Sequence, residues 1–170
     1  SALVLAACGG EGSTADSSKS AGANGSDQVL NLIESAEIPT MDSVQATDTV
    51  AFTALSNVNE GLYRQGLDGT VELGIAAEDP TVSEDGLVYT FTIRDEANWS
   101  NGEPVTADDF VYSWRKLVDP ASAASYSYMM DGVIANATEI MAGEVGPEEL
   151  GVKAIDEKTL EITLASPVPY

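Results

Sequence analysis

Histidine is absent from the 170-residue sequence, and cysteine occurs only once, at Cys8. Without an imidazole, Ser-His-Asp and Cys-His catalysis are excluded, as is every metal site that includes a histidine ligand. With a single cysteine, the chain forms neither an internal disulfide nor a paired-cysteine redox or zinc site. The remaining options are carboxylate chemistry, an oxygen-ligated metal, or no catalysis at all.

Basic residues are also scarce. Seven lysines and arginines stand against 28 acidic residues, which gives a net charge of −21. Such a field repels the phosphate backbone of nucleic acids and the headgroups of anionic lipids, so we expect no nucleic-acid partner. Hydrophobic residues nevertheless make up 44% of the chain, which is enough to build a core.

Long apolar runs are missing too. The opening residues 1–7 are too few to span a bilayer, which takes about 20 apolar residues, and they look like the end of a secretory signal peptide. Leu5-Ala6-Ala7-Cys8 resembles the bacterial lipobox, which implies that Cys8 carries a lipid anchoring the protein to the membrane. Residues 9–28 contain no Val, Ile, Leu, Met or aromatic residue, so residues 8–28 are predicted to be the lipidated cysteine and a flexible linker.

The remaining chain has the apolar patterns of a mixed α/β fold. A helix is predicted after the capping pair Thr47-Asp48, and a second one begins at Thr106 with two acids in its first turn. We expect Gly61 to stop the first helix and Asp119-Pro120 to end the second. A shorter helix is predicted at 134–143. Alternation and β-branched residues predict strands at 29–33, 62–64, 71–73, 87–94, 152–155 and 160–164.

Few residues stand out as candidates for chemistry. The acidic pairs at 78–79 and 84–85 lack the spacing of a calcium loop, and Asp108-Asp109 are explained by the positive end of a helix, so no metal site is predicted. No two carboxylates stand out as an acid–base pair. Trp99 lies in a turn and offers a ring for stacking on a ligand, but core packing is the favoured interpretation. Core packing is also favoured by spacing alone for the segment 126–130, whose tyrosines and methionines would otherwise line a permissive pocket.

A series of motifs in a fixed order gives the strongest signal. Asp85–Arg94 (DGLVYTFTIR) and Trp99–Lys116 (WSNGEPVTADDFVYSWRK), followed by Asp119-Pro120, resemble the solute-binding proteins of peptide ABC importers, the oligopeptide- and dipeptide-binding family. Asn59–Leu62, Leu150–Asp156 and Ser166–Tyr170 fit the same family. The resemblance extends from residue 29 to the end of the sequence.

This resemblance implies a two-lobed α/β fold of the periplasmic-binding-protein type II, which closes on its ligand by a hinge. It implies no catalysis and no cofactor. The peptide is held as an added strand by backbone hydrogen bonds, while roomy hydrated pockets accept its side chains. The expected partners are an oligopeptide and the ABC permease subunits, and we expect a monomer anchored outside the cytoplasm through Cys8. The net charge would favour basic or neutral peptides.

Family members are much longer than this chain, so the sequence is interpreted as an N-terminal fragment. Residues 29–59 would begin lobe one, and residues 60–170 would form most of an accessory subdomain. Thr47 matches a cleft position at which an acid of the family meets a basic group of the peptide, with Asp48 beside it, and Tyr126 matches a cleft-facing tyrosine. The acid that holds the peptide's amino terminus comes from the C-terminal lobe, so this fragment alone is not expected to bind peptide.

Three alternatives stay open. The same scaffold is used by relatives for nickel, haem, sugars or signalling peptides. From other classes, a surface hydrolase acting through a carboxylate pair and a surface adhesin remain possible.

Overall fold

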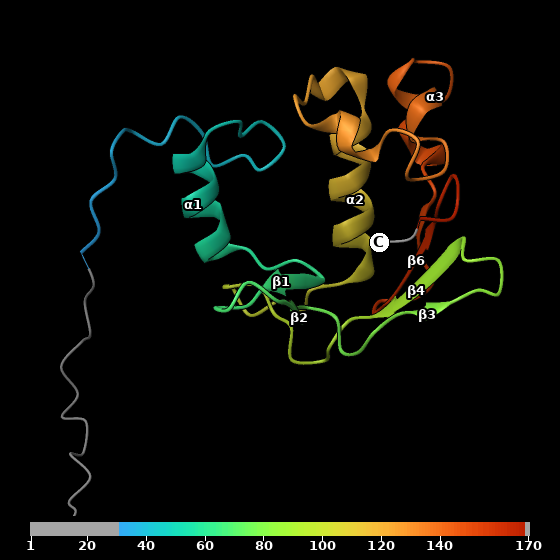
Figure 1. Ribbon diagram of the computed structural model, residues 1–170, viewed down its shortest axis with the longest axis horizontal. Helices are drawn as coiled ribbons and strands as arrows, with labels where there is room; N and C mark the ends of the chain where they lie inside the picture. Colours follow the sequence, from blue (N-terminus) through green and yellow to red (C-terminus); the bar gives the residue numbers. More distant parts are fainter. Residues whose placement is uncertain (1–30, 169–170) are drawn as a thin grey trace, which may run out of the picture. The chain divides into compact units, whose positions relative to one another are not determined.

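The computed structural model describes residues 31–168. The chain divides into two compact units, residues 1–33 and 34–170, and all described helices and strands belong to the second (Figure 1). In chain order, with η for a 3-10 helix, the elements are α1 (Thr49–Val58), β1 (Tyr63–Gln65), β2 (Val71–Leu73), β3 (Thr81–Val82), β4 (Val88–Thr92), α2 (Ala107–Val118), η1 (Pro120–Ser122), η2 (Ser127–Met130), α3 (Ala137–Met141), η3 (Pro147–Glu149), β5 (Val152–Ala154) and β6 (Thr159–Thr163). The prediction of a mixed α/β fold is confirmed.

Four antiparallel strands form the larger sheet, in the order β3-β4-β6-β5. Phe91 of β4 lies opposite Leu160 of β6, and Val152 of β5 lies opposite Ile162 of β6. All four residues are buried, and cross-strand partners project to the same side of a sheet. Helix α2 packs against β5 and β6, so it covers the apolar face of the sheet at these two strands.

Helix α2 begins and ends where the sequence predicts. A carboxylate oxygen of Asp109 accepts hydrogen bonds from the Thr106 backbone N–H at 2.8 Å and from the Thr106 hydroxyl at 3.1 Å. Such a cap stabilises a helix by about 1 kcal/mol. Val111 and Val118 are buried on the inner face of the helix, and Pro120 follows the cap residue Asp119 at the start of η1.

The described chain has two separate apolar cores. The main core is formed by residues between Leu62 and Leu164, including the sheet face and the inner face of α2. Ala46, Ala51 and Leu55 form a second, much smaller cluster around α1. No described residue before Leu62 is a buried member of the main core. The segment that carries α1 is therefore packed largely by itself.

Two strand predictions need correction. Residues 29 and 30 of the strand expected at 29–33 lie outside the described residues, and Asn31–Ile33 are irregular, with Ile33 99% exposed. A strand forms when a neighbour accepts its backbone hydrogen bonds, and no described strand pairs with this segment. Strand β3, which the sequence analysis missed, has only two residues, and two residues show no alternation.

The helix predictions need smaller adjustments. Helix α1 ends at Val58, three residues before the predicted stop at Gly61, and Asn59 is its cap. The helix predicted at 134–143 is regular only over Ala137–Met141, because the residue before it, Asn136, has a left-handed backbone with φ of 67°. Within residues 31–168, no helix is long and apolar enough to cross a membrane.

Candidate functional site

The two site residues predicted on the first helix lie at the start of α1. Asp48 is the N-cap: its carboxylate accepts a hydrogen bond from the Ala51 N–H at 2.9 Å. Thr47 is exposed. The loop before the helix is held by Asp42, whose carboxylate accepts the Val44 N–H at 2.9 Å and pairs with Lys116 at 3.4 Å. The Val44 N–H and then the positive charge of Lys116 lower the pKa of Asp42.

Tyr126, the predicted cleft-facing tyrosine, lies against α1. It precedes η2, it is half-buried, and its ring centroid is 5.9 Å from that of Phe52 in α1. The centroid of a third ring, that of Tyr128, lies 6.0 Å from the centroid of Tyr126. We call Phe52, Tyr126 and Tyr128 the aromatic cluster. Its ring separations lie within the range of favourable aromatic pairs.

The aromatic cluster links the predicted residues to one another. Asp48 is the cap of α1, and Phe52 lies four positions later, in the first half of the helix. Phe52 contacts Tyr126, which brings the tyrosine next to the first half of α1. No direct contact joins Tyr126 to Thr47 or Asp48 among the described hydrogen bonds and ring pairs. Phe52 thus connects Tyr126 to the helix that Asp48 caps.

Phe52 and Tyr128 are the residues of this region that the sequence analysis did not select. Phe52 is 40% exposed and Tyr128 is 62% exposed, although each ring contacts Tyr126. Core packing, the interpretation favoured by spacing for the segment 126–130, is wrong for Tyr128 and Met129, which are exposed, while Met130 packs against the main core. The sequence does contain one signal for Phe52: it lies one helical turn after the cap residue Asp48.

The start of α1 is fixed against η1 and α2 by polar contacts. The Gln45 side-chain amide donates a hydrogen bond to the backbone carbonyl of Ser122 in η1. The Lys116–Asp42 ion pair adds a contact to α2. Both contacts are exposed, so each contributes little stability by itself.

Trp99 is not the core residue that the sequence favoured. It is 46% exposed, and its indole N–H donates to the same Asp109 carboxylate that caps α2, at 3.3 Å. Its ring lines a cavity of about 490 Å³ together with Trp114, Glu60 and Arg94. The contact with Asp109 gives Trp99 a structural partner at the start of α2.

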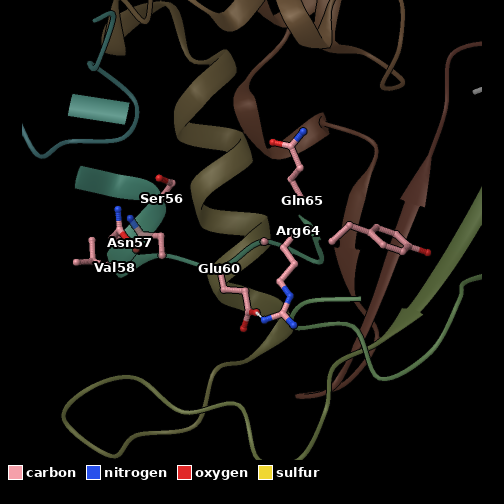
Figure 2. A pocket seen from close by; sticks show the side chains of 9 residues that line it. Ser56, Asn57, Val58, Glu60, Arg64 and Gln65 are labelled. Atoms are coloured by element: carbon pink, nitrogen blue, oxygen red, sulfur yellow. Dashed lines mark hydrogen bonds and ion pairs between the residues drawn. The ribbon is translucent and has the colours of Figure 1, made fainter. Parts of the chain in front are cut away.

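A larger hollow, of about 680 Å³, lies beside the end of α1 (Figure 2). All of its lining residues come from the single segment 56–65. In Figure 2, Glu60 and Arg64 point toward each other and form an ion pair, with an oxygen-to-nitrogen distance of 3.2 Å. Ligand sites usually bring together groups from several elements. We therefore assign this hollow to the junction after α1 and not to the ligand.

The described carboxylates do not gather into a metal site. Among residues 31–168, no three acidic or cysteine side chains are grouped so that they could hold a metal ion. Asp68, Asp85 and Asp156 have lowered pKa values because each accepts hydrogen bonds from a neighbouring hydroxyl and backbone N–H in its own turn. These groups stabilise turns. Cys8, the predicted lipidation site, lies outside the described residues.

Most of this chain is similar to known bacterial binding proteins. Residues 70–170 match the profile of the bacterial extracellular solute-binding proteins, family 5, middle region. The periplasmic oligopeptide-binding protein OppA of Escherichia coli is 42% identical over 144 residues, which are 84% of this chain and 26% of that protein. The oligopeptide-binding protein OppA of Bacillus subtilis is 38% identical over 170 residues, which are 99% of this chain and 30% of that protein.

Solved structures give the same result. Listeria monocytogenes OppA bound to peptide has a TM-score of 0.77 and 51% identity, covering 81% of this chain and 27% of that one. Haemophilus influenzae OppA in complex with the peptide RPPGFSPFR has a TM-score of 0.73 and 39% identity, covering 77% of this chain and 26% of that one. One relative is named for another ligand: the probable deoxycholate-binding periplasmic protein YgiS of E. coli is 35% identical over 144 residues, 84% of this chain and 27% of that protein.

These matches show which fold the chain has and how much of its relatives' length it spans. The similarity in structure shows the periplasmic-binding-protein fold of OppA over the matched region. The chain spans about a quarter to three tenths of the length of the curated relatives it matches.

Proposed function

Because the chain belongs to the bacterial extracellular solute-binding proteins of family 5, we propose that it forms one side of the binding cleft of an oligopeptide receptor that serves an ABC importer. Membership of this family confirms two expectations from the sequence: the family resemblance itself, and a binding protein instead of an enzyme. The hydrolase alternative is therefore abandoned.

One observation supports an oligopeptide as the ligand. The chain shares 51% of its sequence, over 81% of its length, with an OppA that was solved with a bound peptide. Peptide side chains differ widely, so a receptor for many peptides must take its affinity from the backbone that they share. A peptide bound as an added strand, with its side chains in hydrated pockets, meets this requirement.

Thr47, Asp48 and Tyr126 are the proposed ligand contacts, and Phe52 is added to them because it joins α1 to Tyr126. Asp48 already accepts one hydrogen bond as a helix cap, which leaves further lone pairs on its carboxylate for a basic group. The net charge of −21 favours basic or neutral peptides. The affinity for Lys-Ala-Lys should therefore fall with added salt more than the affinity for Ala-Ala-Ala.

The domain boundary belongs to this proposal. The small cluster around α1 and the main core from Leu62 onward support a division near residues 59 and 60, with residues 29–59 in lobe one and residues 60–170 in an accessory subdomain. In the proposed two-lobed receptor, a hinge motion closes the lobes on the peptide. The chain alone is then not expected to bind peptide, because one side of a cleft makes only part of the contacts.

The location of the receptor is also proposed: outside the cytoplasmic membrane, as a monomer held there by a lipid on Cys8 and facing the permease subunits. The support is the Leu5-Ala6-Ala7-Cys8 pattern, followed by a polar segment rich in Gly and Ser. Replacing Cys8 with serine removes the acceptor of the lipid. The Cys8→Ser protein should move from the membrane fraction to the medium or periplasm, and continued membrane attachment would show that the anchor is wrong.

Ligands that co-purify with the full-length protein test the function. The protein is purified from its host without added peptide and denatured, and the released compounds are identified by mass spectrometry. A mixed pool of peptides is the expected result. One defined compound would instead identify a dedicated receptor, an alternative that the similarity to the probable deoxycholate-binding protein favours. For that outcome, deoxycholate is the first compound to titrate.

A further inference from the structure

Glu60 makes two ion pairs across the junction between α1 and the rest of the described fold. One of its carboxylate oxygens lies 3.2 Å from a guanidinium nitrogen of Arg64 in β1, and the other lies 2.7 Å from a guanidinium nitrogen of Arg94, just after β4. The Glu60 side chain is only 26% exposed, which makes it the most buried partner in any described ion pair. Figure 2 shows Glu60 reaching from the end of α1 toward Arg64.

The backbone on one side of Glu60 is fixed. The Ile75 N–H donates to the Gly61 carbonyl at 2.8 Å, and the Gly74 N–H donates to the Leu62 carbonyl at 2.9 Å. Gly74 allows this close approach, because a Cβ at that position would lie 2.5 Å from the Gly61 carbonyl oxygen. Residues 61 and 62 are therefore bonded to residues 74 and 75, which follow β2.

On the other side of Glu60, no described backbone hydrogen bond joins the chain before it to the chain after it. Helix α1 ends at Val58, and its buried residues, Ala51 and Leu55, do not belong to the main core. The direction of α1 relative to the sheet is therefore set by the short connection at Asn59 and Glu60 and by the contacts that α1 and its loop make. At the C-terminal end of α1, Glu60 provides the shortest of the ion pairs.

We propose that Glu60 is a positioning residue of the peptide site: its ion pairs with Arg94 and Arg64 hold α1 at the angle that presents Thr47, Asp48 and Phe52 to the ligand. This inference rests on the proposed function. Glu60 acts through α1 and does not touch the peptide. A ten-residue helix is only marginally stable without tertiary contacts, so loosening its attachment lowers the population of the ordered, correctly placed helix.

The test compares Glu60→Gln with Glu72→Gln in the full-length protein. Both substitutions remove one negative charge and leave an isosteric amide, but Glu72 pairs with Arg64 inside the β1–β2 hairpin at 3.4 Å and does not contact Arg94. If Glu60→Gln leaves α1 correctly placed for about a tenth to a third of the time, the apparent Kd rises about three- to tenfold. The Kd for RPPGFSPFR is measured by calorimetry, and the exchange of backbone amides by mass spectrometry.

In the Glu60→Gln protein we expect a three- to tenfold higher Kd and faster amide exchange in α1, with exchange in β4 and β6 unchanged. Glu72→Gln should change neither quantity, and Arg94→Gln should reproduce the effect of Glu60→Gln, with no further loss in the double variant. Unchanged exchange in α1, or an equal increase in β4 and β6, would overturn the positioning role. If the wild-type protein binds no peptide, the proposed function fails, and the exchange of the α1 amides still decides whether Glu60 fixes this helix.

Discussion

The contact between Phe52 and Tyr126 gives a measurable prediction for peptide binding. Phe52→Ala removes one ring of a pair whose centroids are 5.9 Å apart. Such pairs contribute about 0.5–1.5 kcal/mol beyond burial of area. If this energy holds Tyr126 in the orientation that the peptide requires, its loss raises Kd by about two- to thirteenfold.

Folding stability should change much less than it does for a core phenylalanine. A fully buried Phe replaced by Ala typically costs about 3–5 kcal/mol, because the removed side chain leaves a cavity. Phe52 is already 40% exposed, so water occupies the space that the ring leaves. We therefore expect a loss of about 1 kcal/mol, close to the value of the ring pair alone.

The assay is calorimetric titration of the full-length protein with RPPGFSPFR, with stability followed in urea. Tyr126→Ala and the double variant complete a cycle that isolates the coupling between the two rings. Val58→Ala is the matched control, because Val58 lies on the same helix and is 68% exposed. If Phe52→Ala binds as tightly as Val58→Ala, or if the two ring deletions multiply in the double variant, the aromatic cluster does not act as a unit in binding.

Three further predictions concern the stability of the fold. Leu160→Ala, at a fully buried position in the centre of the sheet, should lower the free energy of unfolding in urea by about 2–5 kcal/mol. Gly86→Ala should cost about 1–2 kcal/mol, because Gly86 has a φ of +71° at the turn before β4; an unchanged urea midpoint would show that this turn adapts. The pKa values of Asp42, Asp68, Asp85 and Asp156 are lowered in the folded state, so their stabilisation is present above the unfolded pKa of about 3.9 and is lost as the pH falls through the folded values. With no histidine to titrate, the urea midpoint should be nearly constant between about pH 6 and 8.

The sequence predicts best the parts of this fold that have a local cause. The start of α2 follows from Thr106 and Asp109, which cap the helix within three residues of each other. The turn before β4 follows from Asp85-Gly86, where glycine adopts the left-handed backbone and the carboxylate accepts the Leu87 N–H. In both cases, the residues that cause the structure are neighbours in the chain.

The candidate site was harder to predict because its causes are distant in the chain. Tyr126 and Phe52 are separated by more than seventy positions, and periodicity carries no information about such a contact. For the same reason, spacing alone favoured a core role for Tyr128, which is exposed. The family resemblance identified Tyr126 and Thr47, but it did not identify Phe52, which belongs to no quoted motif.

The way α1 is attached makes the proposed site dependent on polar and aromatic contacts. A helix buried in a shared core would be held by apolar area, at about 25 cal/mol for each Å² removed from water. The buried residues of α1 instead form a cluster separate from the main core, and contacts such as Phe52–Tyr126, Lys116–Asp42 and Glu60–Arg94 join the two parts. An exposed ion pair such as Lys116–Asp42 contributes between about 0 and 1 kcal/mol. The angle of α1 is therefore more easily changed than the packing of the sheet, and a ligand that contacts both Asp48 and Tyr126 would select one angle from those available.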